Sequence, residues 1–108
     1  MYKVQLEKFE GPLDLLLDLI EKEKLDISEV SLAQVANQYL DYIDGASDID
    51  PTQLADFLMV AAKLILIKSR TLLPEFQVDE EDEESIEDLK YRLAEYKRFK
   101  EASIKIKA

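Results

Sequence analysis

The sequence lacks the side chains on which most enzyme and metal chemistry depends. Its 108 residues contain no cysteine and no histidine, and the two glycines are Gly11 and Gly45. Without cysteine there is no disulfide and no thiolate nucleophile, and without histidine the usual general base and zinc ligand are missing. Two isolated glycines cannot form a phosphate-binding loop. We therefore expect a protein that is not an enzyme and that has neither a cofactor nor a metal.

Long apolar runs are missing as well. No run reaches the roughly 18 to 20 residues that a membrane-spanning helix needs. The first residues, MYKVQLEKFE, lack the charged-then-apolar order of a signal peptide. These features favour a cytoplasmic protein that has no membrane contact.

The two signs of charge are separated along the chain. The net charge is −10; residues 90–108 hold seven cations and two acids, a net charge of +5, which leaves −15 for residues 1–89. The acidic body repels nucleic acid at long range, whereas the basic end attracts it.

The basic end supports one alternative function, a nucleic-acid-binding helical module acting through residues 90–108. Tyr91, Tyr96 and Phe99 would be its stacking groups. However, these aromatic residues fall mostly on the apolar face of their predicted helix, and the neighbouring acids oppose DNA. Direct DNA binding is therefore not expected.

Apolar residues recur at steps of three and four in four segments, which predicts an all-α fold, a small helical bundle of about four helices. Pro12 and Pro51 each suit a first helical turn, and Asp50 suits a cap. Ser31 with Gln34 predicts a capping box. The expected helices, in chain order, are 12–24, 31–44, 51–73 and 85–102.

The segments outside these helices have patterns of their own. Tyr2, Val4 and Leu6 alternate with polar residues, which predicts a short extended N-terminal arm lying across the helices. Six acids at 79–84 repel one another and lack the spaced loop and glycine of an EF-hand, so we expect a solvated linker. The predicted organisation is a helical domain at 1–74, an acidic linker at 75–84, and a fourth helix that begins a further segment at 85–108.

The helix predicted over 51–73 is apolar on more than one side. From Phe57 to Ile67 only Lys63 is polar, so this helix must be buried nearly all round. Either the helix at 85–102 covers the free row, or the helices of a partner do; self-association of two copies is a third arrangement. Burying about five such side chains stabilises by roughly 8–15 kcal/mol before association costs are subtracted.

Three blocks of sequence resemble one family. FEGPLDLLLDLIEKEKLDI (Phe9 to Ile27) and MVAAKLILIKSRTLLP (Met59 to Pro74) closely resemble the bacterial and archaeal kleisin family called segregation and condensation protein A, and YRLAEYKRFKEA (Tyr91 to Ala102) fits it too. The order and spacing agree across almost the whole chain. The family usually has Val-Met-Ala-Ala where this chain has Met59-Val60-Ala61-Ala62, a change of side-chain shape and not of polarity.

The resemblance implies a function in chromosome condensation and segregation. In that family the N-terminal helical domain packs against the coiled-coil neck of one SMC ATPase, and the SMC heads hydrolyse the ATP. A dimer of segregation and condensation protein B grips the middle segment, and a C-terminal winged helix docks on the other SMC head. The chain would thus be a non-enzymatic kleisin fragment that binds the SMC neck and is nucleoid-associated through SMC.

The resemblance also bears on the extent of the chain. Family members are more than twice as long, so we expect the N-terminal domain alone, which puts ring closure by this chain in doubt. Segregation and condensation protein B would bind the region after the helix at 85–102.

Carried over onto matching positions, the resemblance also implies binding residues. Lys68 and Arg70 would lie at the rim of the contact, with a solvated helix end as the other interpretation. Tyr39 and Ile43 of the preceding helix are secondary binding candidates, with core packing as the alternative. The row expected to contact the SMC neck consists of Phe57, Val60, Leu64, Ile67 and Leu72.

Overall fold

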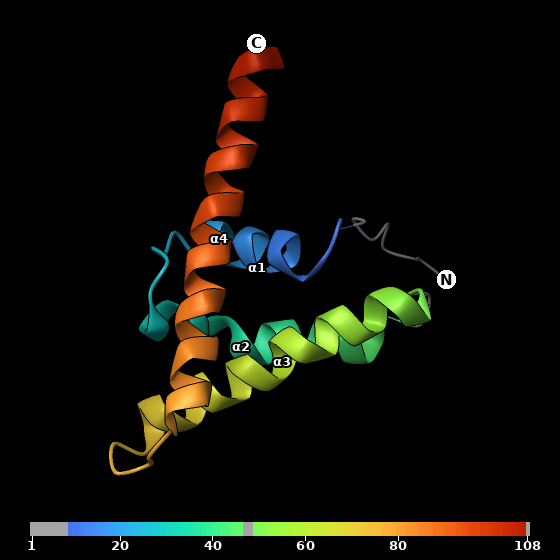
Figure 1. Ribbon diagram of the computed structural model, residues 1–108. Helices are drawn as coiled ribbons and strands as arrows, with labels where there is room; N and C mark the ends of the chain where they lie inside the picture. Colours follow the sequence, from blue (N-terminus) through green and yellow to red (C-terminus); the bar gives the residue numbers. More distant parts are fainter. Residues whose placement is uncertain (1–8, 47–48, 108) are drawn as a thin grey trace.

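The computed structural model describes residues 9–46 and 49–107, and within these ranges the chain forms four helices and no strand (Figure 1). The helices are α1 (Pro12–Lys22), α2 (Glu29–Gly45), α3 (Pro51–Leu72) and α4 (Glu80–Lys107). The predicted all-α bundle is confirmed. The predicted N-terminal arm, residues 2–6, lies outside the described ranges.

The first helix ends two residues earlier than predicted because Lys24 adopts a left-handed backbone conformation, with φ of 57°. The N–H of Lys24 donates to the carbonyl of Glu21 over 3.0 Å, and the N–H of Leu25 donates to the carbonyl of Ile20 over 2.9 Å. This pair of bonds is the Schellman pattern, which satisfies the last carbonyl groups of a helix.

The prediction of a capping box at Ser31 is wrong. The cap of α2 is Ser28, whose backbone is extended and whose hydroxyl accepts the N–H of Ser31 over 3.2 Å. Ser31 already lies inside the helix, where its hydroxyl donates to Asp26 over 3.0 Å. The prediction for α3 is confirmed: Asp50 accepts the N–H of Thr52 over 3.4 Å.

The fourth helix is longer than predicted at both ends. It begins at Glu80 and not at Ser85, so most of the acidic run that we expected in a linker forms its first turns. The carboxylate of Asp79 accepts the N–H of Asp82 over 2.8 Å. Acids at the start of a helix are favoured by its dipole, and this outweighs their mutual repulsion. The segment between α3 and α4 is correspondingly short.

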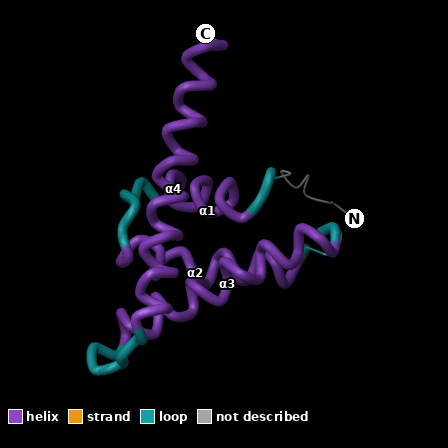
Figure 2. The backbone as a smooth tube through the Cα atoms, in the orientation of Figure 1, coloured by secondary structure: helices purple, strands orange, loops and turns teal. Residues whose placement is uncertain are grey.

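Helices α2 and α3 form an antiparallel pair and make the most extensive contact in the molecule (Figure 1). Helix α1 lies beside this pair, and α4 runs across the bundle against both α1 and α3. The C-terminal part of α4 projects beyond the other helices, as the backbone tube in Figure 2 shows. Helix α4 still contacts α1 as far along as Lys100, which donates to Asp14, and the turns beyond it project.

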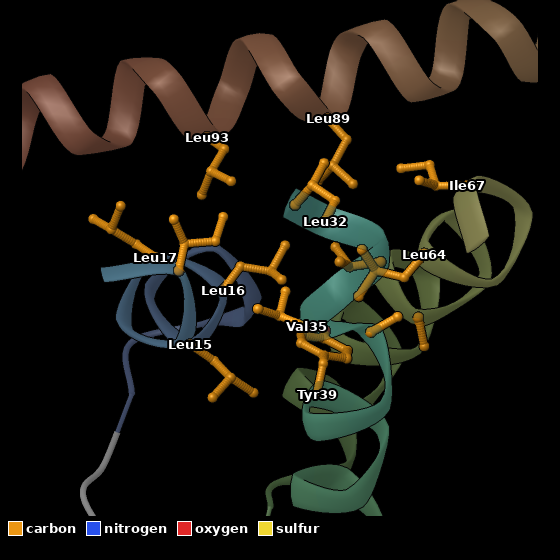
Figure 3. Close-up of a cluster of buried hydrophobic side chains, with 14 of the residues drawn as sticks. Leu15, Leu16, Leu17, Leu32, Val35, Tyr39, Leu64, Ile67, Leu89 and Leu93 are labelled. Atoms are coloured by element: carbon orange, nitrogen blue, oxygen red, sulfur yellow. The ribbon is translucent and has the colours of Figure 1, made fainter. Parts of the chain in front are cut away.

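All four helices contribute to one core. From α4, Leu93 points toward Leu17 and Leu89 points toward Leu32, with Ile67 of α3 beside them (Figure 3). Within the α2–α3 pair, the buried hydroxyl of Tyr39 donates to the backbone carbonyl of Phe57 over 2.8 Å. Burial raises the pKa of Tyr39, so its hydroxyl stays a neutral donor. This hydrogen bond fixes how α2 and α3 meet.

Candidate protein-binding surface on helix α3

Helix α3 uses one side for the core of its own chain. Its buried residues follow steps of three and four, and they pack in the core that α3 shares with α2, α1 and α4. They are Phe57, Val60, Ala61, Leu64 and Ile67. Helix α3 has a second side that is equally apolar, and this side faces solvent.

The exposed side carries large aliphatic residues. Leu58 is 50% exposed, Met59 62%, Ile65 52% and Leu72 66%. Ala62 lies among them and is exposed as well. We call these five residues the α3 stripe. A soluble monomer rarely exposes a contiguous apolar patch of more than a few hundred Å², so a stripe of this kind indicates an interaction surface.

Four residues of the stripe, together with Ser69, have the spacing of a coiled-coil seam. Leu58, Ala62, Ile65, Ser69 and Leu72 are separated by steps of four, three, four and three. This period of 3.5 residues keeps one seam facing a partner helix. Large residues alternate with Ala62 and Ser69, whose small side chains let a second helix approach closely. The 22 residues of α3 make it about 33 Å long.

One edge of the stripe opens into a groove between α3, α1 and α4. The groove has a volume of about 610 Å³, and its apolar lining includes Leu13 of α1, Val60 of α3 and Leu89 of α4. Met59 of the stripe lies at its border, together with the charged residues Asp56 and Lys63. A side chain of a helix lying on the stripe could enter this groove.

The structure corrects the predicted contact row. Phe57, Val60, Leu64 and Ile67 have exposed fractions of only 3%, 8%, 0% and 0%. The chain buries them itself, because α2 packs along this side of α3 and α4 covers its C-terminal end (Figure 3). Of the predicted row, only Leu72 is exposed and belongs to the stripe. A free surface does exist on α3, but it is on the other side of the helix.

Lys68 and Arg70 are bound within the chain and do not form a free rim. Lys68 donates to the side-chain oxygen of Asn37 over 2.7 Å. The guanidinium of Arg70 donates twice to Glu29 of α2, over 3.0 and 2.8 Å, and also to Glu83 of α4. The hydrogen bonds to Glu83 and Glu29 raise the pKa of Arg70. Arg70 thus joins the end of α3 to the starts of α2 and α4.

The secondary candidates belong to the core. Tyr39 is completely buried, and Ile43 is partly buried and packs against the core cluster. Both residues therefore fit the alternative interpretation, in which they pack in the core and do not bind a partner.

The exposure of Leu58, Met59 and Ile65 differs from the predicted contact row, which does not include them. A signal was present for Leu58 and Ile65, because the alternation of four and three steps with large and small residues runs through both to Leu72. Met59 lies outside this alternation. Residue polarity alone gives no such signal, since the sides of α3 that carry Leu64 and Ile65 are both apolar.

The basic end of α4 is largely paired with acids. Lys90 pairs with Glu87 over 3.1 Å, Arg92 with Asp88 over 2.7 Å, and Arg98 with Glu95. Because these cations already have acidic neighbours, they are weak attractors for phosphate groups.

A further ion pair connects α4 to α1. Lys100 donates to Asp14 over 3.0 Å, and the hydroxyl of Tyr96 donates to Glu10 over 3.2 Å. Burial alone would raise the pKa of Asp14. The hydrogen bonds from the N–H of Glu10 and the ammonium of Lys100 lower this pKa by more than burial raises it, so the net shift is downward. The hydrogen bond to Asp14 raises the pKa of Lys100.

Two other kinds of site are absent from the described ranges. Within the described ranges, no group of acidic residues is arranged to hold a metal ion. No helix of this part is both long and apolar enough to cross a membrane. The α3 stripe is therefore the candidate functional surface.

Comparison with known proteins gives one consistent result. Residues 19–107 match the family described as segregation and condensation protein ScpA. A curated protein of that name from Halothermothrix orenii is 42% identical over 103 residues, which cover 95% of this chain and 42% of the relative. One from Caldanaerobacter subterraneus subsp. tengcongensis is 43% identical over 105 residues, covering 94% and 42%. A third, from Streptococcus pyogenes, is 43% identical over 100 residues, covering 93% and 43%. The chain thus spans less than half the length of these relatives.

Proposed function

The chain belongs to the family of segregation and condensation protein ScpA, and on this premise we propose that it docks on the coiled-coil neck of an SMC ATPase. Membership confirms the resemblance carried by Phe9 to Ile27 and Met59 to Pro74. The role that we propose for the chain is the one in the names of its relatives, chromosome segregation and condensation.

The observation that carries the proposal is the exposed α3 stripe. A coiled coil presents ridges and grooves into which another helix with apolar residues at coiled-coil spacing can pack. The stripe has that spacing from Leu58 to Leu72. Its residues are on the side of α3 that the chain itself leaves uncovered.

The energy available from the stripe is moderate. Removing the exposed parts of its four large side chains from water stabilises a complex by about 3 to 6 kcal/mol before association costs are subtracted. This is too little for tight binding by the stripe alone. The neck must therefore also contact the border of the stripe, where the groove between α1, α3 and α4 begins.

We propose a non-enzymatic role. ATP would be hydrolysed by the SMC partner, and the chain would act in the cytoplasm, associated with the nucleoid through SMC. Segregation and condensation protein B would bind the region after residue 102, where the end of α4 projects away from the bundle (Figure 2). The ion pairs along α4 argue against direct DNA binding.

Two measurements test the proposal. In calorimetric titrations, the chain should bind an SMC head that carries its neck and should fail to bind the same head without the neck. Equal binding to both heads, or binding to neither, would refute neck docking. Light scattering over a range of protein concentrations tests the other occupant of the stripe, a second copy of the chain: a mass that rises to that of a dimer would favour self-association.

A further inference from the structure

A second row of residues runs along α2, next to the α3 stripe. Its members are separated by steps of three, four, three and four, so they share one face of α2. They are Val30, Ala33, Asn37, Leu40 and Asp44. Val30 is 60% exposed, and Asn37 and Asp44 are exposed as well. We call these five residues the α2 row. Gln38 follows Asn37 directly and therefore points about 100° away from the row.

The α2 row and the α3 stripe lie on the same face of the α2–α3 pair, because a hydrogen bond joins them. Lys68 follows Ile65 by three residues and precedes Leu72 by four, so it stands at the edge of the apolar seam. The ammonium of Lys68 donates to the side-chain oxygen of exposed Asn37 over 2.7 Å. We call the surface made by the row and the stripe the α2–α3 face.

Lys68 brings a positive charge to this face that no acid of the described ranges neutralises. Its printed partner, Asn37, is an uncharged amide, whereas the guanidinium of Arg70 is paired with Glu29 and Glu83. In the heptad that places Leu58, Ile65 and Leu72 in the seam, Lys68 has the flanking position from which charges reach a partner helix.

The opposite charge lies at the other end of the face. Asp44 follows Asn37 by seven residues, which is two turns or about 10.5 Å along α2. Its carboxylate has no partner in the described part of the chain. Asp41, one turn after Asn37, is exposed and unpaired there too. The α2–α3 face is therefore positive beside Lys68 and negative beside Asp44.

We infer that Lys68 and Asp44 fix the direction of the helix that docks on the α2–α3 face, whose acid lies beside Lys68 and whose cation lies beside Asp44, about two turns away. This inference rests on the proposed function, because it specifies the chemistry of the neck helix that covers the stripe. The occupant is an amphipathic helix with an apolar seam and these two charges on its flank, since that pattern complements the face.

The physical basis is the difference between apolar and charged contacts. Apolar contacts are weakly directional, so a helix lying on the stripe in either direction buries a similar area. Charges beside a seam select the orientation, because the wrong orientation places like charges together. A partner helix that is reversed on this face would bring its cation to Lys68 and its acid to Asp44. The two directions of one partner helix are therefore not equivalent.

The two charges can be exchanged without altering the net charge. The variant Asp44→Lys with Lys68→Glu inverts the polarity of the face. A matched control exchanges Lys97→Glu with Glu101→Lys on α4, where neither residue has an ion pair within the described ranges. The probe is an SMC head that carries its neck, titrated by fluorescence anisotropy with each variant that circular dichroism shows to be folded.

We expect the exchange at 44 and 68 to weaken binding on the order of 10-fold, with the control exchange binding like the wild type. The neutral variant Asp44→Asn with Lys68→Gln should weaken binding less, by roughly 3-fold, and its loss should shrink in high salt. The neutral variant is the test if the exchanged variant does not fold. Among heads that each have one neck acid changed to lysine, one should restore binding to Lys68→Glu.

The inference is overturned if the exchanged and neutral variants bind as tightly as the wild type, if the control exchange weakens binding equally, or if no neck variant restores binding to Lys68→Glu. In those cases the wild type still binds the neck and the proposed function stands. A wild-type chain that does not bind the neck at all defeats the proposed function, and with it this inference.

Discussion

Leu64 and Ile65 are neighbours in α3, and the turn of about 100° between them places one side chain in the core and the other in solvent: Leu64 is 0% exposed and Ile65 is 52% exposed. Leu64 belongs to the core shared by the four helices, and Ile65 lies in the middle of the α3 stripe. Leu64 thus marks the side of α3 that packs in the core of its own chain, and Ile65 marks the side that is available to a partner.

Stability and binding should therefore respond to different members of the pair. Leu64→Ala should destabilise the chain by about 2 to 5 kcal/mol, because it leaves a cavity in the core. Ile65→Glu should change the stability by less than about 0.5 kcal/mol, and it should abolish binding to an SMC neck because it buries a charge in an apolar seam. Urea unfolding and calorimetric titration measure the two effects. Neck binding by folded Ile65→Glu at the wild-type affinity would show that the stripe is not the contact.

The hydrogen bond from Tyr39 to the carbonyl of Phe57 gives a second prediction. Tyr39→Phe should lower the free energy of unfolding by about 0.5 to 1.5 kcal/mol, because a buried hydrogen bond is lost while the ring is kept. Neck binding should not change. Tyr91→Phe is the control, since Tyr91 is 65% exposed and its change should be close to zero. Equal effects of the two substitutions on urea unfolding would contradict this role of Tyr39.

The contacts of Arg70 with Glu29 and Glu83 predict that lysine cannot replace it. Arg70→Lys should destabilise the chain by about 1 kcal/mol, because an ammonium cannot reproduce the paired donation of a guanidinium to one carboxylate. The loss should decrease in high salt. Arg92→Lys is the matched control, because Arg92 makes a single exposed contact within α4 and such pairs contribute little. Thermal melts that place both variants at the wild-type midpoint would contradict the account.

The ion pair between Asp14 and Lys100 predicts a pH dependence. The pKa of Asp14 is lower in the folded chain than its ordinary value of 3.8, so its contribution to stability is present above that value and is lost as the pH falls through the folded value. The pKa of Lys100 is raised from 10.5, so its contribution is present below that value and is lost as the pH rises through the folded value. Asp14→Asn should make urea stability fall less steeply between pH 5 and 2 than in the wild type. A slope equal to that of the wild type would show that the pair does not stabilise the fold.

Much of the fold could be predicted from local signals. Pro12, Asp50 and Pro51 place the starts of α1 and α3, because proline and a capping carboxylate act within one turn. Ser28 and Ser31 are both suitable caps for α2, and the choice between them depends on the contact of Ser31 with Asp26. The predicted start of α4 is too late, because the helix dipole favours acids in the first turn although these acids repel one another.

The exposed side of α3 could not be chosen from residue types, because the sides that carry Leu64 and Ile65 are equally apolar. The choice is made by tertiary packing: α2 and α4 cover the side of Leu64, and Tyr39 anchors that side through Phe57. The coiled-coil spacing through Leu58, Ile65 and Leu72 was the signal that could have resolved it. The partners of Lys68 and Arg70 are equally a product of the fold, since Asn37 and Glu29 are distant in sequence.

The most direct test of the account is site-specific cross-linking, which is simple here because the chain has no cysteine. Ile65→Cys on the stripe and Gln38→Cys on the exposed side of α2 each create a single thiol. With a bifunctional thiol reagent and an SMC head carrying single cysteines along its neck, we predict that Ile65→Cys links to the neck and Gln38→Cys does not. Linking through Gln38→Cys, with Ile65→Cys left unlinked, would contradict neck binding by the exposed side of α3.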